Sequence, residues 1–136
     1  MVDDVLINKA ATIERCIKRV REEYTKAGVN FATDYSRQDA AILNIQRACE
    51  AALDVGQHLI RVERLGVPQS SRDVFTLLAQ ANWIDANIAE AMKRMVGFRN
   101  IAVHDYQAIL LPIVENIITN HLDDFVNFSK QLLQQK

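Results

Sequence analysis

The chain has 136 residues, of which 49% are apolar and 24% charged, with a formal net charge of −1. This composition excludes a disordered tail and a membrane-spanning protein, and the near-neutral charge gives no general attraction for polyanions. Only four glycines and two prolines occur, whereas the two together make up roughly 12% of an ordinary chain. So few turn residues disfavour sandwiches, barrels and nucleotide-binding α/β sheets. We expect one all-α domain over residues 1–136, an up-and-down bundle of about five helices.

Two long helices are predicted in the first half of the chain. Apolar or small residues alternate in steps of three and four over residues 6–27, and Gly28 then suits the end of a helix. After a loop, Ser36 and Asp39 form a variant capping box, which predicts that a second helix starts there. That helix is expected to run to about Arg64, where a Leu-Gly-Val-Pro sequence stops it.

The second half of the chain predicts two shorter helices and one more long one. The serines at residues 70–71 suit the start of a short helix, and a break near residues 82–85 leads into a fourth helix. The segment from Arg99 to Leu111 is less regular. Pro112 suits the first position of a last, long helix.

The cysteines and the N-terminus indicate the compartment. Cys16 and Cys49 are isolated in the sequence, without a CxxC motif, and are predicted to be buried, reduced thiols. The acidic N-terminus lacks the long apolar run of a secretory signal. No window approaches 18 uninterrupted apolar residues, so no membrane partner is expected. The expected location is cytoplasmic.

The sequence offers no signature of a metal or cofactor site. The three histidines are scattered at positions 58, 104 and 121 and lack metal-ligand spacing, although His121 and Asp124 could chelate in principle. No glycine-rich phosphate loop and no nucleophilic triad is found. We therefore expect neither a metal ion nor a cofactor.

Residues 99–106 (Arg-Asn-Ile-Ala-Val-His-Asp-Tyr) combine several side chains that could act on a phosphate ester. On a continuous helix Asn100 and His104 share a face, and Arg99 lies about 100° round from Asn100. If the helix ends near His104, its negative end favours the protonated imidazole. An imidazole moves protons near neutral pH, and a guanidinium stabilises charge on phosphate oxygens. Spacing alone nevertheless favours a structural pair, with Arg99 solvated and His104 capping helix carbonyls.

The sequence Arg99-Asn100-x-x-x-His104-x-Tyr106 resembles the signature of HEPN-domain toxins, and of the HepT-like family in particular. These are small all-helical proteins encoded beside a minimal nucleotidyltransferase antitoxin, MntA. The likeness covers nearly the whole chain, including the loop at residues 66–73. The polar pattern of the second helix also matches that of the family, in Asn44, Arg47, Glu50, Asp54 and His58.

The resemblance implies a metal-independent endoribonuclease, the toxin of a type VII toxin–antitoxin system. It implies that His104 is the general acid and base, that Arg99 binds the scissile phosphate, and that Asn100 positions the substrate. The nucleophile would be the RNA's own 2′-hydroxyl. It also implies a homodimer in which two motifs face one cleft, where Lys93, Arg94 and Arg99 would concentrate positive charge.

The resemblance gives Tyr106 a second role, as the acceptor of AMP from the partner nucleotidyltransferase. A nucleotide on this tyrosine would block RNA and neutralise the cationic cleft. Without the resemblance, the Tyr106 ring would be expected to pack over a helix end with its hydroxyl in water. The implied partners are RNA, a second copy of the chain and an MntA-like antitoxin.

Polar residues also recur at helical spacing in the second helix, and two interpretations remain open. They form either a solvated face or a layer in which Glu50 or Asp54 orients the motif Arg or His. This polar stripe consists of Arg47, Glu50, Asp54, His58 and Arg61.

Two other functions compete with the ribonuclease. A non-catalytic helical subunit of a nucleotidyltransferase would hold substrate or nucleotide with Arg99 and His104, and would need its partner for any chemistry. A purely structural dimer would lose nothing but stability when either residue is replaced. An enzyme would cleave RNA alone. The intact motif favours the enzyme.

Overall fold

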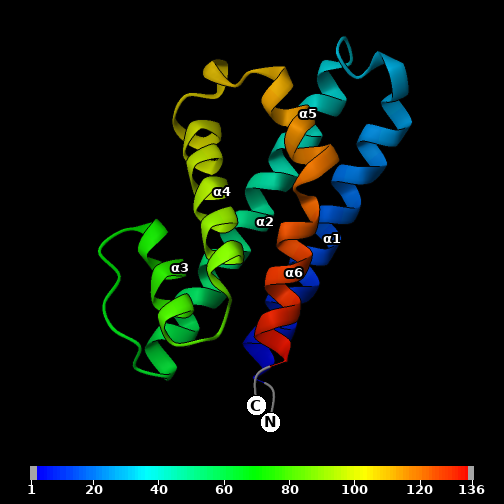
Figure 1. Ribbon diagram of the computed structural model, residues 1–136. Coiled ribbons are helices and arrows are strands. Elements are labelled where there is room, and N and C mark those ends of the chain that lie inside the picture. Colours follow the sequence, from blue (N-terminus) through cyan, green and yellow to red (C-terminus); the bar gives the residue numbers. More distant parts are fainter. Residues whose placement is uncertain (1–2, 135–136) are drawn as a thin grey trace.

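The computed structural model describes residues 3–134, and in that range the chain forms six α-helices, two short 3₁₀ turns and no strand. Figure 1 shows their arrangement. The elements are α1 (Asp4–Ala27), η1 (Gly28–Asn30), α2 (Tyr35–Val62), α3 (Ser71–Gln80), α4 (Ala86–His104), η2 (Tyr106–Ala108), α5 (Leu111–Asn120) and α6 (Leu122–Leu133).

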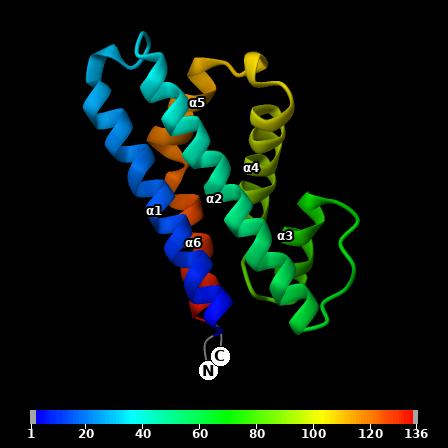
Figure 2. The same cartoon turned by 180° about the vertical axis from the view of Figure 1, so that it is seen from behind.

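The long helices α1 and α2 form an antiparallel pair on which the other helices are assembled (Figures 1 and 2). Helix α6 packs against α1, α4 packs against α2, and α3 fills the angle between α2 and α4. A continuous core of buried side chains joins them, with Phe75, Phe125 and Phe128 among the largest. The predicted all-α up-and-down bundle is confirmed.

The predicted number of helices was one too low because the last helix is interrupted. His121, with φ −128° and ψ −1°, ends α5 and precedes α6. The residues before it, Ile117 to Asn120, are poor helix formers, which lowers the cost of a break. Pro112 occupies the second helical position of α5 and not the first.

The start of α2 also differs from the prediction. Its N-cap is Asp34, whose carboxylate accepts a hydrogen bond from the Arg37 backbone N–H at 3.1 Å. Ser36 therefore lies inside the first turn, and the predicted capping box of Ser36 and Asp39 is wrong. The Asp34 side chain already satisfies an N–H of the first turn. Asp39 is thus left free to bond elsewhere.

Other predicted boundaries and burial are confirmed. Gly28 ends α1 with a positive φ of 55°, and Ser70 caps α3. Asn82, with φ 64°, lies in the break before α4. Cys16 and Cys49 are buried free thiols. No helix within residues 3–134 has the length and apolar character needed to cross a bilayer.

Candidate ribonuclease site

Helix α4 contains the motif from Arg99 to His104, and His104 is the last residue of the helix. The segment expected to become irregular at Arg99 stays helical as far as His104, where the Asp105 N–H donates to the Ile101 carbonyl at 2.8 Å. Asn100 and His104 therefore lie four residues apart on one face of a continuous helix. The helix ends immediately after the histidine, so its free carbonyls place partial negative charge near the imidazole.

Arg99 is held in place from two sides. Its Nε and Nη2 each lie 3.4 Å from the Oε2 of Glu50 on α2, and its Nη1 donates to the Asn100 Oδ1 at 3.1 Å. The arginine side chain remains 26% exposed. A neighbouring helix thus orients the guanidinium without removing it from solvent.

His104 is held by no side chain in the part of the chain that the structure describes. Its ring is exposed, and no residue from 3 to 134 forms a hydrogen bond or an ion pair with it. The predicted capping of helix carbonyls by this imidazole is therefore not observed within that range. Both ring nitrogens are free to contact a ligand.

Tyr106 lies in η2, directly beyond the end of α4. Its hydroxyl donates a hydrogen bond to the Asp39 carboxylate, so the hydroxyl is not simply in water. Partial burial, this hydrogen bond and the negative charge of Asp39 raise the pKa of Tyr106 to about 12. The phenol is therefore fully protonated at neutral pH. Sequence reasoning treated Asp39 only as a capping residue, and its separation of 67 positions from Tyr106 leaves no local signal.

The polar stripe on α2 divides between two roles. Glu50 contacts Arg99 of the motif, as one of the two interpretations requires. Asp54 instead pairs with Lys9 at 3.1 Å, and His58 contacts Asp3 at 2.5 Å, so both join α2 to the start of α1. Of Glu50, Asp54 and His58, Glu50 is the one that contacts the motif.

The cations expected beside Arg99 are distributed around α4. Lys93 pairs with Glu90 at 3.2 Å, while Arg94 lines a groove beside α5. In a helix these positions point about 120–140° away from Arg99. One chain therefore does not gather the three cations on one face.

Arg72 is a cation near the motif that sequence reasoning missed. Its Nε donates to the Lys93 carbonyl at 3.3 Å. Its Nη2 lies 2.8 Å from the place where a Cβ on Gly97 would be. Because Gly97 has no side chain, the guanidinium lies directly against α4, about one helical turn before Asn100. No carboxylate within residues 3–134 pairs with Arg72.

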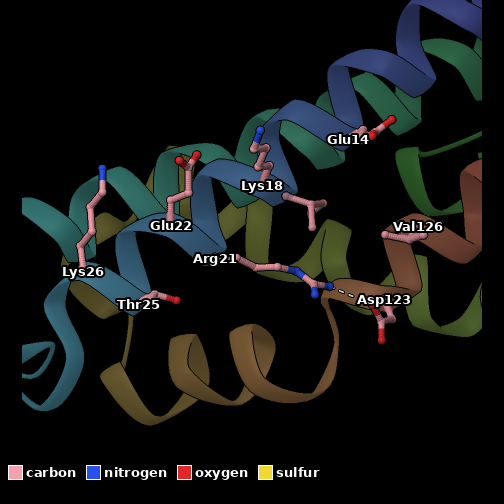
Figure 3. Close-up of a pocket in the computed structure, with 9 residues that line it drawn as sticks. Glu14, Lys18, Arg21, Glu22, Thr25, Lys26, Asp123 and Val126 are labelled. Carbon is pink, nitrogen blue, oxygen red and sulfur yellow. Dashed lines mark hydrogen bonds and ion pairs between the residues drawn. The ribbon is translucent and has the colours of Figure 1, made fainter.

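A hollow separate from the motif lies between α1 and α6, and the close-up in Figure 3 shows its lining. It measures about 640 Å³ and contains none of the motif residues. Arg21 pairs there with Asp123 at 2.8 Å, and two lysines are offset by two glutamates. This balanced charge does not favour RNA over other ligands. Across residues 3–134, no group of three metal-ligating side chains occurs, and His121 bonds to Asp124 at 3.1 Å.

Comparison with known proteins identifies the family. The profile of the ribonuclease HepT-like family matches residues 13–132. The chain belongs to the ribonuclease HepT-like family. A curated relative, the mRNA nuclease HepT of Shewanella oneidensis, is 52% identical over 127 residues, which are 93% of this chain and 95% of the relative.

Solved structures agree with this assignment to the HepT-like family. A tri-AMPylated HEPN toxin from S. oneidensis, in complex with its MNT antitoxin, superposes with a TM-score of 0.93 and 48% identity. The match covers 98% of this chain and 100% of that toxin. YutE of Bacillus subtilis, at 16% identity and a TM-score of 0.72, shares the fold alone over 90% of this chain and 87% of its own.

Proposed function

We propose that this HepT-like protein is the toxin of a type VII HEPN–nucleotidyltransferase pair, and that it cleaves RNA without a metal ion. Membership of the family makes it a ribonuclease. The observation that carries the more detailed proposal is the end of α4, where Arg99 is anchored by Glu50 and His104 is exposed. We assign the activity to one domain, residues 1–136. RNA as the substrate supports action in the cytoplasm.

The proposed mechanism uses side chains as they lie at the end of α4. His104 removes the proton from the 2′-hydroxyl that attacks the neighbouring phosphorus, and an imidazole then protonates the departing 5′-oxygen. Arg99 stabilises the negative charge that grows on the phosphate oxygens. Asn100, already bonded to Arg99, positions the phosphate or the ribose. The expected products carry 2′,3′-cyclic phosphate ends.

We further propose that two copies build one site. A groove of about 310 Å³, lined by Met95, Phe98, Ile101 and Ile113, lies between α4 and α5 beside the motif. A second copy covering this apolar groove would bring two motifs to one cleft. The dimer would double the available Arg72, Arg94 and Arg99 side chains. These cations supply local positive charge for RNA, although the net charge of each chain is −1.

Control of the toxin is proposed to act at Tyr106. The S. oneidensis relative is described as tri-AMPylated and bound to an MNT antitoxin. A tyrosine two residues beyond His104, 43% exposed, is accessible to an MntA-like nucleotidyltransferase. Each added AMP brings a bulky nucleotide and a negative phosphate to the rim of the cationic site, so RNA would be excluded.

The test compares the purified wild-type protein with a His104→Ala variant on total RNA in excess chelator. We expect cleavage by the wild type, with cyclic phosphate ends, and a loss of at least about 100-fold in the variant. His58→Ala is the matched control, because His58 contacts Asp3 at the other end of α2.

Two outcomes would contradict this proposal. Equal cleavage by the wild type and by His104→Ala would show that His104 is not the acid or base. No cleavage by an unmodified wild-type dimer would favour the non-catalytic subunit of a nucleotidyltransferase, which needs its partner for chemistry.

A further inference from the structure

Two segments far apart in sequence meet at the proposed AMP acceptor. Asp39 lies near the start of α2 and Tyr106 lies in η2. The start of α2 and the segment between α4 and α5 are at the end of the bundle opposite the start of α1 (Figure 1). The Tyr106 hydroxyl donates directly to Asp39 Oδ1. No other side chain within residues 3–134 bonds to that hydroxyl. The hydrogen of the phenol is therefore directed at a carboxylate oxygen.

The chemistry of AMP transfer requires a group that accepts this proton. The pKa of Tyr106 is raised to about 12 by burial first and by Asp39 second, so no phenolate is present beforehand at neutral pH. A neutral phenol is a weak nucleophile unless a base removes its proton as the new bond forms. The Asp39 carboxylate is exposed, and no cation in the described part of the chain is paired with it. Its proton-accepting oxygen is therefore not blocked.

We propose that Asp39 is the general base for the first transfer of AMP to Tyr106. The inference rests on the proposed function, which makes Tyr106 the acceptor. The phenol oxygen bonds to the α-phosphorus of a nucleoside triphosphate that the nucleotidyltransferase holds. The bond between that phosphorus and the β-phosphate oxygen breaks, and pyrophosphate leaves with the electron pair. The phenol proton passes to Asp39 Oδ1.

Asp39 as a general base and Asp39 as a structural residue would have different effects on successive additions of AMP. After the first transfer the tyrosine oxygen carries phosphorus and has no hydrogen left to donate. With Tyr106 as the acceptor of every AMP, a second or third AMP would be added to a hydroxyl of the nucleotide already attached, which lies farther from Asp39. The carboxylate therefore accelerates only the first of several additions. A residue that merely holds η2 or docks the transferase would affect every addition.

The experiment follows AMP addition by intact-mass spectrometry, with the complete toxin, the cognate nucleotidyltransferase, ATP and Mg²⁺. Asp39→Asn keeps the size and one hydrogen-bond acceptor but removes the base. We expect the first addition to slow by about 100-fold or more, while singly modified protein proceeds to higher states at the wild-type rate. Asp39→Glu should recover part of the first rate. Asp54 is also an exposed carboxylate on α2, so an Asp54→Asn variant should be modified at the wild-type rate.

Three results would overturn the inference, each for a different reason. A wild-type first rate in Asp39→Asn would assign the base to the nucleotidyltransferase. Equal slowing of all additions would make Asp39 a docking or folding residue, and circular dichroism distinguishes these two. Unchanged modification of a Tyr106→Phe variant would show that the acceptor itself was wrongly proposed, and the Asp39 role would fall with it.

Discussion

Arg99 shows how one neighbouring side chain prepares a binding group. Glu50 holds the guanidinium through two nitrogens at 3.4 Å, which is longer than a strong charge-assisted hydrogen bond. The contact is therefore loose enough to be exchanged for a phosphate, yet it restricts where the arginine points before RNA arrives. The pair is partly exposed, so it contributes little to folding.

Replacement of Glu50 should consequently harm cleavage more than stability. We expect Glu50→Gln to lower kcat/KM on the order of 10-fold, because a freed Arg99 must be ordered at each encounter. The free energy of unfolding should change by less than about 1 kcal/mol. Single-turnover cleavage and urea unfolding measure the two effects. Asp54→Asn is the control, and an equal loss in both variants would contradict the positioning role of Glu50.

At the scale of the elements, the site depends on how closely helices approach α2 and α4. At Gly56 in α2, a Cβ would lie 2.5 Å from the Val74 Cγ1 of α3, whose side chain is fully buried. At Gly97 in α4, the nearest atom would be the end of the flexible Arg72 side chain at 2.8 Å. The first contact is fixed by the core and the second can move aside.

The two glycines therefore predict different responses to alanine. Gly56→Ala should destabilise the fold, because overpacking costs about 1–3 kcal/mol and improved helix propensity returns at most about 1 kcal/mol. Gly97→Ala should be neutral or slightly stabilising, since Arg72 can swing into solvent. Urea unfolding of both variants compares these energies. A Gly56→Ala protein at least as stable as Gly97→Ala would disprove the packing argument.

At the scale of the whole molecule, the proposed dimer relates the apolar surface to activity. Ile101, Leu110 and Ile113 are 42%, 64% and 50% exposed, and all lie near the end of α4 or on the helix that follows it. Burying them between copies removes apolar area from water beside the motif. A substitution that prevents dimerisation through this surface should therefore also reduce catalysis.

A matched pair of substitutions tests this coupling. Ile113 is 50% exposed beside the motif, and Ile7 is 49% exposed on α1. We expect Ile113→Glu to convert a dimer to a monomer and to reduce RNA cleavage at least about 10-fold, because a charge must be desolvated at the interface. Ile7→Glu should change neither. Light scattering with size-exclusion chromatography gives the mass, and a fully active Ile113→Glu monomer would rule out a shared site.

The sequence by itself determined the helical class, the burial of both cysteines and most helix boundaries, because apolar spacing and capping residues act within a few positions of one another. It also identified the family through Arg99, Asn100, His104 and Tyr106. It misplaced the start of α2, because Asp34 and Ser36 are both competent caps and local preference does not rank them. The break at His121 is not predicted because the apolar stripe of the last helix continues through it.

Only the tertiary structure decided which side chains serve the motif. Glu50 is 49 positions from Arg99, and Asp39 is 67 positions from Tyr106. Helical periodicity relates residues three or four apart, so it left Glu50 with two possible roles and gave Asp39 none beyond capping. The packing of α4 against α2 brings Glu50 to Arg99, and it places η2, which follows α4, where Tyr106 reaches Asp39. The motif in the sequence therefore indicates the chemistry, whereas the packing of the helices decides that Glu50 and Asp39 contact the motif.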